Sequence, residues 1–134
     1  MIERPNWDDY FLGIAKAVAA RADCSRRQVG CVIVDANRRI VSTGYNGSPR
    51  GGPSCLLGAC PRATSGVAPG SSYDTGVGVC IALHAEQNAL LYSDYTRIAG
   101  GTAYITDKPC DGCTRLLRGT TLATVIWPEG EYHL

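Results

Sequence analysis

Residues 31–41, with the sequence CVIVDANRRIV, contain two short apolar runs on either side of a polar segment. The runs are rich in β-branched residues, which favour strands, whereas Asp and Asn are typical turn residues. The pattern therefore predicts a β-hairpin with strands at 31–34 and 39–41.

Helical and extended patterns alternate around this hairpin. Asn6 is a favourable N-cap with Asp9 at the capping-box position, and apolar residues then recur at helical spacing, which predicts a helix over about 7–22. Downstream, composition and spacing predict a helix, a strand, a helix and a strand, at 81–93, 103–106, 109–119 and 123–127. This order predicts an α/β domain in which helices cover a sheet.

The length and charge of the chain limit its partners. Its 134 residues fit a single domain spanning 1–134. The 13 Lys and Arg nearly balance the 12 Asp and Glu, so we expect no nucleic-acid polymer as partner, although a small anionic ligand remains compatible. No apolar run reaches the roughly 18 residues of a membrane span, and no signal peptide is recognisable at the N-terminus. We therefore expect a cytoplasmic protein with no membrane partner.

Residues 45–80 form a long segment rich in Gly, Pro and Ser that carries Cys55, Cys60 and Cys80. Long loops without secondary structure are usually functional or disordered. The cysteines favour a function for the two ends of the segment, whereas its middle, about 61–79, is expected to be a mobile loop.

Seven cysteines in a chain without a secretory signal favour metal binding or catalysis over disulfides, because cytosolic thiols stay reduced. The stretches 84–86 (HAE) and 109–113 (PCDGC) carry the ligand types that zinc prefers. His84, Cys110 and Cys113 would supply one imidazole and two thiolates and leave a fourth position for water, as in a catalytic zinc site. The predicted helix N-terminus at Cys110 should also favour the thiolate form.

Glu86 adds a carboxylate next to this predicted metal site. Residues two apart within a helix do not share a face, so His84 and Glu86 can serve one pocket only at the mouth of a helix. There Glu86 would move protons to and from the activated water. The alternative is an ordinary surface Glu beside a redox or structural Cys-x-x-Cys pair; the joint pattern makes this alternative the weaker one.

The combined motif H-x-E followed by P-C-x-x-C resembles the cytidine deaminase superfamily, and most closely its deoxycytidylate (dCMP) deaminase family. The matching stretches are Val29-Gly30, 42–49 (STGYNGSP), 84–90 (HAEQNAL) and 109–113. The resemblance implies a three-layer α/β/α fold with a central mixed sheet of about five strands. It also implies hydrolytic deamination of dCMP to dUMP and ammonia, which supplies dUMP for dTMP synthesis, with one catalytic Zn²⁺ and Glu86 as the proton carrier.

The same resemblance implies a set of substrate-binding residues. Asn46 would hold the sugar, although an Asn-Gly dipeptide is by itself a turn signal. Arg4 and Arg26 would lie near the 5′-phosphate, with solvated surface charge as the alternative. Ala85 would contact the substrate, and Tyr132 would close over it.

A second metal site is implied as well, because some members of the family carry a further set of cysteines that Cys24, Cys55, Cys60 and Cys80 match. Four thiolates would form a closed structural zinc site at the ends of the long loop; the alternative is scattered buried cysteines. Cys31, inside a predicted strand, is expected to be a small core residue.

The resemblance further implies a homo-oligomer, commonly a hexamer, with dCTP and dTTP as effectors. The chain ends at Leu134, which departs from the family at the C-terminal strand and helix and leaves this regulation open. Two alternative functions also stay open. One is a deaminase of dCTP, a modified dCMP or another cytosine nucleoside or nucleotide, and the other is a zinc-stabilised binding module without catalysis.

Overall fold

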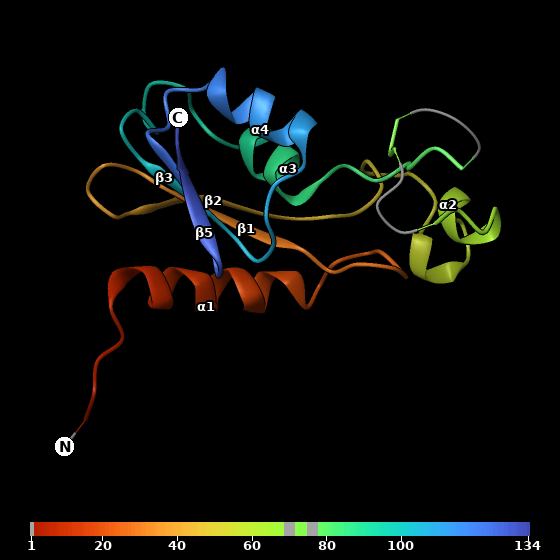
Figure 1. The fold of residues 1–134 in the computed structure, drawn as a ribbon, viewed down its shortest axis with the longest axis horizontal. Coiled ribbons are helices and arrows are strands. Elements are labelled where there is room, and N and C mark those ends of the chain that lie inside the picture. The colour runs from red at the N-terminus through yellow and green to blue at the C-terminus, as the bar shows by residue number, and fades with distance from the viewer. Residues whose placement is uncertain (1, 69–71, 75–77) are drawn as a thin grey trace.

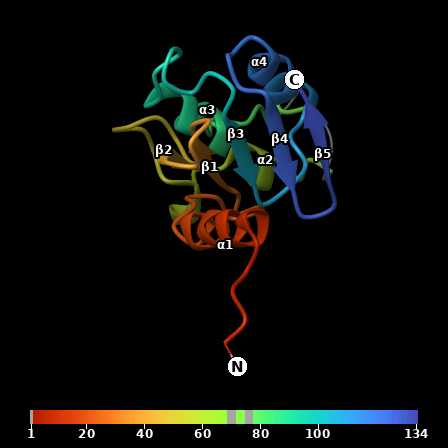
Figure 2. The ribbon, with the colours of Figure 1, turned by 90° about the vertical axis from the view of Figure 1, so that its left-hand side faces the viewer.

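The computed structural model describes residues 2–68, 72–74 and 78–134. A five-stranded sheet of order β2-β1-β3-β4-β5 lies at its centre (Figure 2). The strands β3 and β4 are parallel, and every other neighbouring pair is antiparallel, so the sheet is mixed. The strands are β1 (Gly30–Val34), β2 (Ile40–Tyr45), β3 (Thr102–Ile105), β4 (Thr124–Trp127) and β5 (Gly130–His133).

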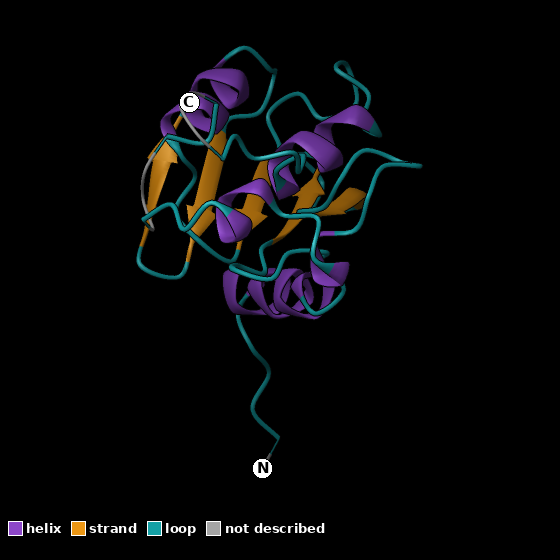
Figure 3. Cartoon of the chain, turned by 90° about the vertical axis from the view of Figure 1, so that its right-hand side faces the viewer, coloured by secondary structure: helices purple, strands orange, loops and turns teal. Residues whose placement is uncertain are grey.

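Helices cover both faces of this sheet (Figures 1 and 3). Helix α1 (Trp7–Ala19) lies on one face, and α3 (Ala85–Leu91) and α4 (Asp111–Arg118) lie on the other. This arrangement confirms the three-layer α/β/α fold that the sequence predicted. Within the described ranges, every helix is too short or too polar to cross a membrane.

Strand β1 connects the two layers of the core because all of its residues are buried. Side chains alternate along a strand, so Cys31 and Ile33 join the cluster under α3 and α4, whereas Val32 and Val34 pack with Phe11 of α1. A strand with both faces covered needs apolar residues at successive positions, which explains the unbroken run at 31–34. Cys31 is fully buried, as expected for a core residue.

Two glycines allow the helices to approach the sheet closely. A Cβ at Gly30 would lie 2.0 Å from the carbonyl oxygen of Ala15 in α1. A Cβ at Gly44 would lie 2.4 Å from the carbonyl oxygen of Ala85 and 2.4 Å from the backbone nitrogen of Ala89, both in α3. Gly44 therefore sets the distance between β2 and the helix that carries Glu86.

The element boundaries differ from the sequence predictions at several points. Asn6 caps α1 as predicted, since its side chain accepts a hydrogen bond from the Asp9 backbone N–H at 2.8 Å, but the helix ends at Ala19 rather than 22. Strand β2 extends to Tyr45, because residues 42–45 pair with β1 beyond a register shift that leaves Val41 without a partner in that register. Helix α3 begins later than 81, because a β-bridge between Gly47 and Leu83 keeps the preceding residues extended.

The long segment after β2 contains short helices that the sequence analysis did not predict. They are a 3-10 turn, η1 (Cys55–Leu57), and α2 (Pro61–Thr64), which has proline at its first position. Proline is favoured there because the backbone N–H of the first helical residue has no partner within the helix, so its absence costs no hydrogen bond. The expected mobility of about 61–79 partly concerns 69–71 and 75–77, which lie outside the described residues.

Strand β5 was also missed from the sequence. Pro128 and Glu129 form a two-residue turn after β4, and Trp127 then pairs with Gly130 and Val125 with Tyr132. Residues 130–133 form the fifth strand, at the edge of the sheet next to β4.

Candidate active site

Three metal-ligand side chains meet between the N-termini of α3 and α4. His84 is the N-cap of α3, Cys110 is the N-cap of α4, and Cys113 lies in the first turn of α4. His84 Nδ1 is 3.1 Å from Cys113 Sγ and 3.5 Å from Cys110 Sγ. All three ligand atoms lie within 4.8 Å of one another, the only such group of three among the residues that the structure describes.

These distances fit a zinc ion. Tetrahedral coordination with Zn–N bonds of about 2.1 Å and Zn–S bonds of about 2.3 Å places nitrogen and sulfur roughly 3.6 Å apart. Little movement would bring the imidazole and the two sulfurs to that spacing. Three protein donors leave one coordination position open, which is the arrangement of catalytic zinc rather than of structural zinc.

Glu86 lies directly beside these ligands. It is the second residue of α3, is only 4% exposed, and forms a hydrogen bond with Cys113. His84 precedes the helix with extended backbone, at ψ 159°, so its ring reaches the same pocket as Glu86 although the two are two residues apart. Both residues line one pocket at the mouth of α3, and their roles in it stay predictions.

Burial dominates the protonation of Cys113. It raises the pKa of the Cys113 thiol far above its ordinary range, and the negative charge of Glu86 raises that pKa further. The sequence analysis expected the helix N-terminus to favour the thiolate, but for Cys113 the loss of hydration outweighs this effect. A divalent cation between the ligands would supply the positive charge that stabilises the thiolate.

A small pocket of about 60 Å³ opens beside this cluster. Of the residues proposed from sequence to bind substrate, Asn46 and Ala85 line it together with Glu86 and the metal ligands His84 and Cys110.

Asn46 has a structural role in addition to its place in the pocket. It is 9% exposed; its Oδ1 accepts a hydrogen bond from the Val29 backbone N–H at 2.8 Å, and its Nδ2 donates to the Arg27 carbonyl at 3.0 Å. The side chain thereby holds the segment before β1 against the end of β2. An amide oxygen has a second lone pair and an amide nitrogen a second hydrogen, so each can still bind a ligand.

The other residues proposed for substrate binding lie outside this pocket. Arg4 lines a separate groove with Trp7 and Arg38 near the start of α1. Arg26 donates to the Val67 carbonyl at 2.7 Å. Tyr132 lies on β5 and packs against Trp127, with ring centroids 4.8 Å apart. None of these three residues lines the pocket, although the Tyr132 ring centroid lies 5.8 Å from Nζ of Lys108 in its wall, and their proposed roles stay predictions.

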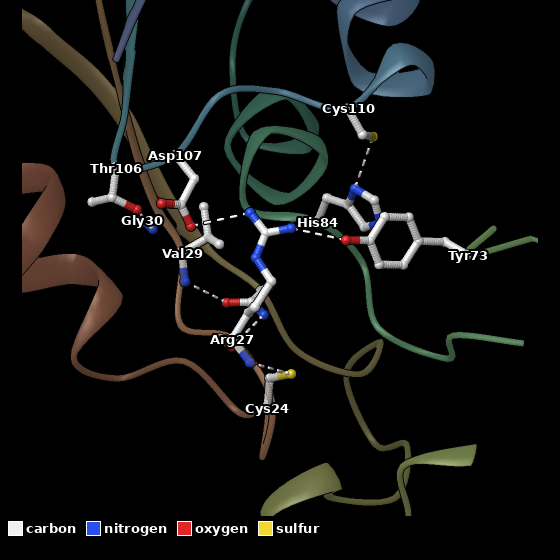
Figure 4. A network of polar contacts seen from close by, with 10 residues as sticks. Cys24, Arg27, Val29, Gly30, Tyr73, His84, Thr106, Asp107 and Cys110 are labelled. Carbon is white, nitrogen blue, oxygen red and sulfur yellow. Dashed lines mark hydrogen bonds and ion pairs between the residues drawn. The ribbon is translucent and has the colours of Figure 1, made fainter. Parts of the chain in front are cut away.

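Four further residues that line the pocket were not predicted from the sequence. The guanidinium of Arg27 donates to the Tyr73 hydroxyl at 2.8 Å and to Asp107 Oδ2 at 3.1 Å (Figure 4). Lys108 follows Asp107 in the pocket wall, and the Tyr73 ring lies edge-on to the His84 ring at 5.0 Å. Asp107 and Lys108 immediately precede the 109–113 motif, and this proximity was the only sequence signal for them.

Of the four remaining cysteines, Cys55 and Cys60 are buried, and Cys24 and Cys80 are half-buried. Burial and the nearby Cys60 raise the pKa of Cys55 to about 11. Burial also raises the pKa of Cys80, with smaller contributions from Cys24 and Cys60. Cys24 Sγ accepts hydrogen bonds from the backbone N–H groups of residues 26 and 27, at 3.4 and 3.3 Å. No three of their sulfurs meet the 4.8 Å spacing found at His84, within the described residues, so the second zinc site stays a prediction.

The sequence and the fold identify the class of this protein. Residues 5–128 match the family model of the cytidine and deoxycytidylate deaminase zinc-binding region. The chain therefore belongs to this family, and His84, Cys110 and Cys113 are placed to bind its zinc ion.

Two relatives and one solved structure show which members of the family are similar to this chain. The chain is 47% identical over 129 residues to the deoxycytidylate deaminase of Mycobacterium phage D29, which covers 96% of this chain and 98% of the phage protein. It is 44% identical to the deoxycytidylate deaminase of Schizosaccharomyces pombe, covering 97% of this chain and 38% of the yeast protein. The fold is similar to that of the dCMP deaminase from cyanophage S-TIM5 in complex with dCMP and dUMP, with a TM-score of 0.68, 24% identity and coverage of 94% and 83%.

Proposed function

We propose that residues 1–134 form one catalytic domain that deaminates dCMP hydrolytically to dUMP and ammonia. The observation that carries this proposal is the buried Glu86, which lines one pocket together with ligands of an open three-ligand metal site. The phage relative, similar over nearly its whole length, is a deoxycytidylate deaminase, which supports dCMP as the substrate.

The chemistry follows from the positions of these side chains. His84, Cys110 and Cys113 would hold Zn²⁺, which when bound lowers the pKa of water towards neutrality. Glu86 takes the proton of the attacking water and transfers it to N3 of cytosine. The attack forms the C4–O bond. Glu86 then takes the proton of the new C4 hydroxyl and delivers it to the amino group, so the C4–N bond breaks, ammonia leaves and C4 becomes a carbonyl.

The remaining predicted contacts belong to the same proposal. Asn46 and Ala85, both in the pocket wall, would contact the sugar and the base. Arg4, Arg26 and Tyr132 would meet the substrate only if a neighbouring copy or a movement of the chain brings them to the pocket.

A second, structural zinc would bind Cys24, Cys55, Cys60 and Cys80. Hydrogen bonds from the Ser54 hydroxyl and the Leu56 backbone N–H to Asp23, at 2.7 and 3.0 Å, support this proposal, because they hold the segment of Cys55 against that of Cys24. The site would fix the long loop to the segment before β1.

We also propose that the chain acts in the cytoplasm as a homo-oligomer, with a hexamer favoured and with dCTP and dTTP as effectors. Exposed apolar side chains at the end of α3 support self-association, since Leu91 is 66%, Tyr92 72% and Tyr95 65% exposed. Light scattering at two protein concentrations, with and without dCTP, tests the oligomer and its response to this effector.

Glu86→Gln tests the catalytic proposal. Wild-type protein should release ammonia from dCMP, and faster than from dCTP or deoxycytidine. The variant should lose turnover by at least about 100-fold while keeping its zinc, because a proton carrier is removed but no ligand. Glu131→Gln, which removes an exposed carboxylate on β5, is the matched control and should remain active. Full activity of Glu86→Gln would refute the mechanism.

A further inference from the structure

We infer that Arg27 is the residue that binds the 5′-phosphate and so makes the pocket specific for a nucleotide over a nucleoside. This inference rests on the proposed function. It begins from the position of Arg27, which lines the same pocket as Glu86 and Asn46. Arg26, the neighbouring arginine, is held instead by the Val67 carbonyl.

The backbone of Arg27 is fixed relative to the residue proposed to hold the sugar. Asn46 Nδ2 donates to the Arg27 carbonyl at 3.0 Å, and Asn46 Oδ1 accepts from the Val29 backbone N–H at 2.8 Å. In a nucleotide the 5′-phosphate is separated from the sugar ring by one carbon and one oxygen. A cationic side chain attached beside the sugar-binding residue is therefore well placed to reach the phosphate.

The guanidinium already binds two oxygen atoms. One Nη donates to the Tyr73 hydroxyl at 2.8 Å, and the other donates to Asp107 Oδ2 at 3.1 Å (Figure 4). Two N–H groups directed at two oxygens are the geometry in which arginine binds phosphate. Asp107 and Tyr73 thus occupy donors that the phosphate would use, and they hold the guanidinium extended across the pocket.

Exchanging Asp107 for the phosphate is energetically favourable. The side chains of Arg27 and Asp107 are 50% and 45% exposed, and ion pairs this exposed contribute little to stability. A phosphate monoester carries close to two negative charges at neutral pH and hydrogen-bonds arginine more strongly than a single carboxylate oxygen does. The folded chain therefore loses little when Arg27 changes partner.

The charges of the pocket wall agree with this assignment. Arg27 and Lys108 are two cations, and Asp107 is the one acid next to them in the wall. Glu86, in the same wall, contacts Cys113 at the metal ligands. The wall therefore combines a proton carrier with cations suited to an anion.

Arg27→Gln tests the assignment in steady-state kinetics with dCMP. The KM for dCMP should rise by about 10- to 100-fold, as expected for the loss of a charged hydrogen-bonding partner. The kcat should stay within about threefold, because the phosphate is bound equally in ground state and transition state. Arg27→Lys should recover part of the affinity, and inorganic phosphate should inhibit wild type competitively but inhibit Arg27→Gln much less.

Two further variants separate phosphate binding from a structural role of the ion pair. If Arg27 acted only by pairing with Asp107, then Asp107→Asn would raise KM as much as Arg27→Gln does. We expect the opposite, a KM equal to or below that of wild type, because a competitor for the guanidinium is removed. Arg97→Gln removes an arginine near Asp35 at the hairpin turn, outside the pocket wall, and should leave KM unchanged.

An unchanged KM in Arg27→Gln, or equal effects of Arg27→Gln and Asp107→Asn, would overturn the inference. The absence of ammonia release by wild-type protein would instead overturn the proposed function. In that case isothermal titration of wild type and Arg27→Gln with dUMP still decides the role of Arg27, since binding needs no turnover. Equal affinities of the two proteins for dUMP would also reject the assignment.

Discussion

Replacing Gly44 by alanine should force α3 away from β2 and weaken the metal site. The added Cβ would lie 2.4 Å from the Ala85 carbonyl oxygen and 2.4 Å from the Ala89 backbone nitrogen, whereas ordinary contacts begin at 3.4 Å. Both of these atoms belong to the helix backbone, so no side-chain rotation relieves the contact. The helix must retreat by about 1 Å, and Ala85 lies directly between His84 and Glu86.

The size of the effect follows from this displacement. Overpacking of a core costs about 1–3 kcal/mol, which for a chain of this length lowers the Tm by roughly 4–12 °C. Metal sites tolerate ligand displacements of about 0.2 Å, so a shift of His84 on the scale of α3 should weaken zinc binding by at least about tenfold.

Thermal unfolding followed by circular dichroism measures the first effect, and competition with a chromophoric chelator measures the second. Gly13→Ala is the matched control, because a Cβ at Gly13 has no neighbour within 4 Å and the residue lies inside α1. Alanine is better than glycine in a helix by about 0.5–1 kcal/mol, so the control should be as stable as wild type or more so. Wild-type values of both Tm and zinc affinity in Gly44→Ala would show that the close approach does not determine the site.

Two further predictions concern the loop cysteines and the hydrogen bonds from Leu56 and Ser54 to Asp23. Wild-type protein should contain two zinc ions per chain and the double variant Cys55→Ser/Cys60→Ser only one, by atomic emission; one ion in wild type would contradict the second site. Hydrogen bonds from the Leu56 backbone and the Ser54 hydroxyl keep the pKa of Asp23 below 3.8 in the folded chain. This contact therefore stabilises the protein above pH 3.8 and is lost as the pH falls through the lower folded-state pKa. Urea midpoints of wild type and Asp23→Asn should converge in that acidic range, and a constant difference would refute the linkage.

The layered fold could be predicted from the sequence because its elements have strong local patterns. The run at 31–34 and the capped helix beginning at Trp7 were both found, since apolar periodicity and capping are local properties. Strand β5 was missed because its four residues show no apolar run, and its pairing with β4 is fixed by a turn after Trp127. Helix α3 was extended too far upstream, because the bridge from Gly47 to Leu83 is a long-range contact.

The metal ligands could be predicted because each motif lies at a helix N-terminus, where the residue spacing determines which side chains converge. The residues around the substrate could not, because they come from irregular segments. Arg26 and Arg27 are neighbours with the same chemistry, and no periodicity indicates which of them faces the pocket. Tyr73 reaches Arg27 from 46 positions away in the chain, a contact that only the folded structure provides.

The sheet order leaves β2 and β5 as edge strands, whose outer backbone groups have no partner within the sheet. Such edges invite intermolecular strand pairing and aggregation unless they are short or charged. Strand β5 has only four residues, carries Glu131 and follows Glu129, so a second chain that paired there would bring like charges together. Copies of this chain should therefore associate through side-chain surfaces and not by extending the sheet at β5.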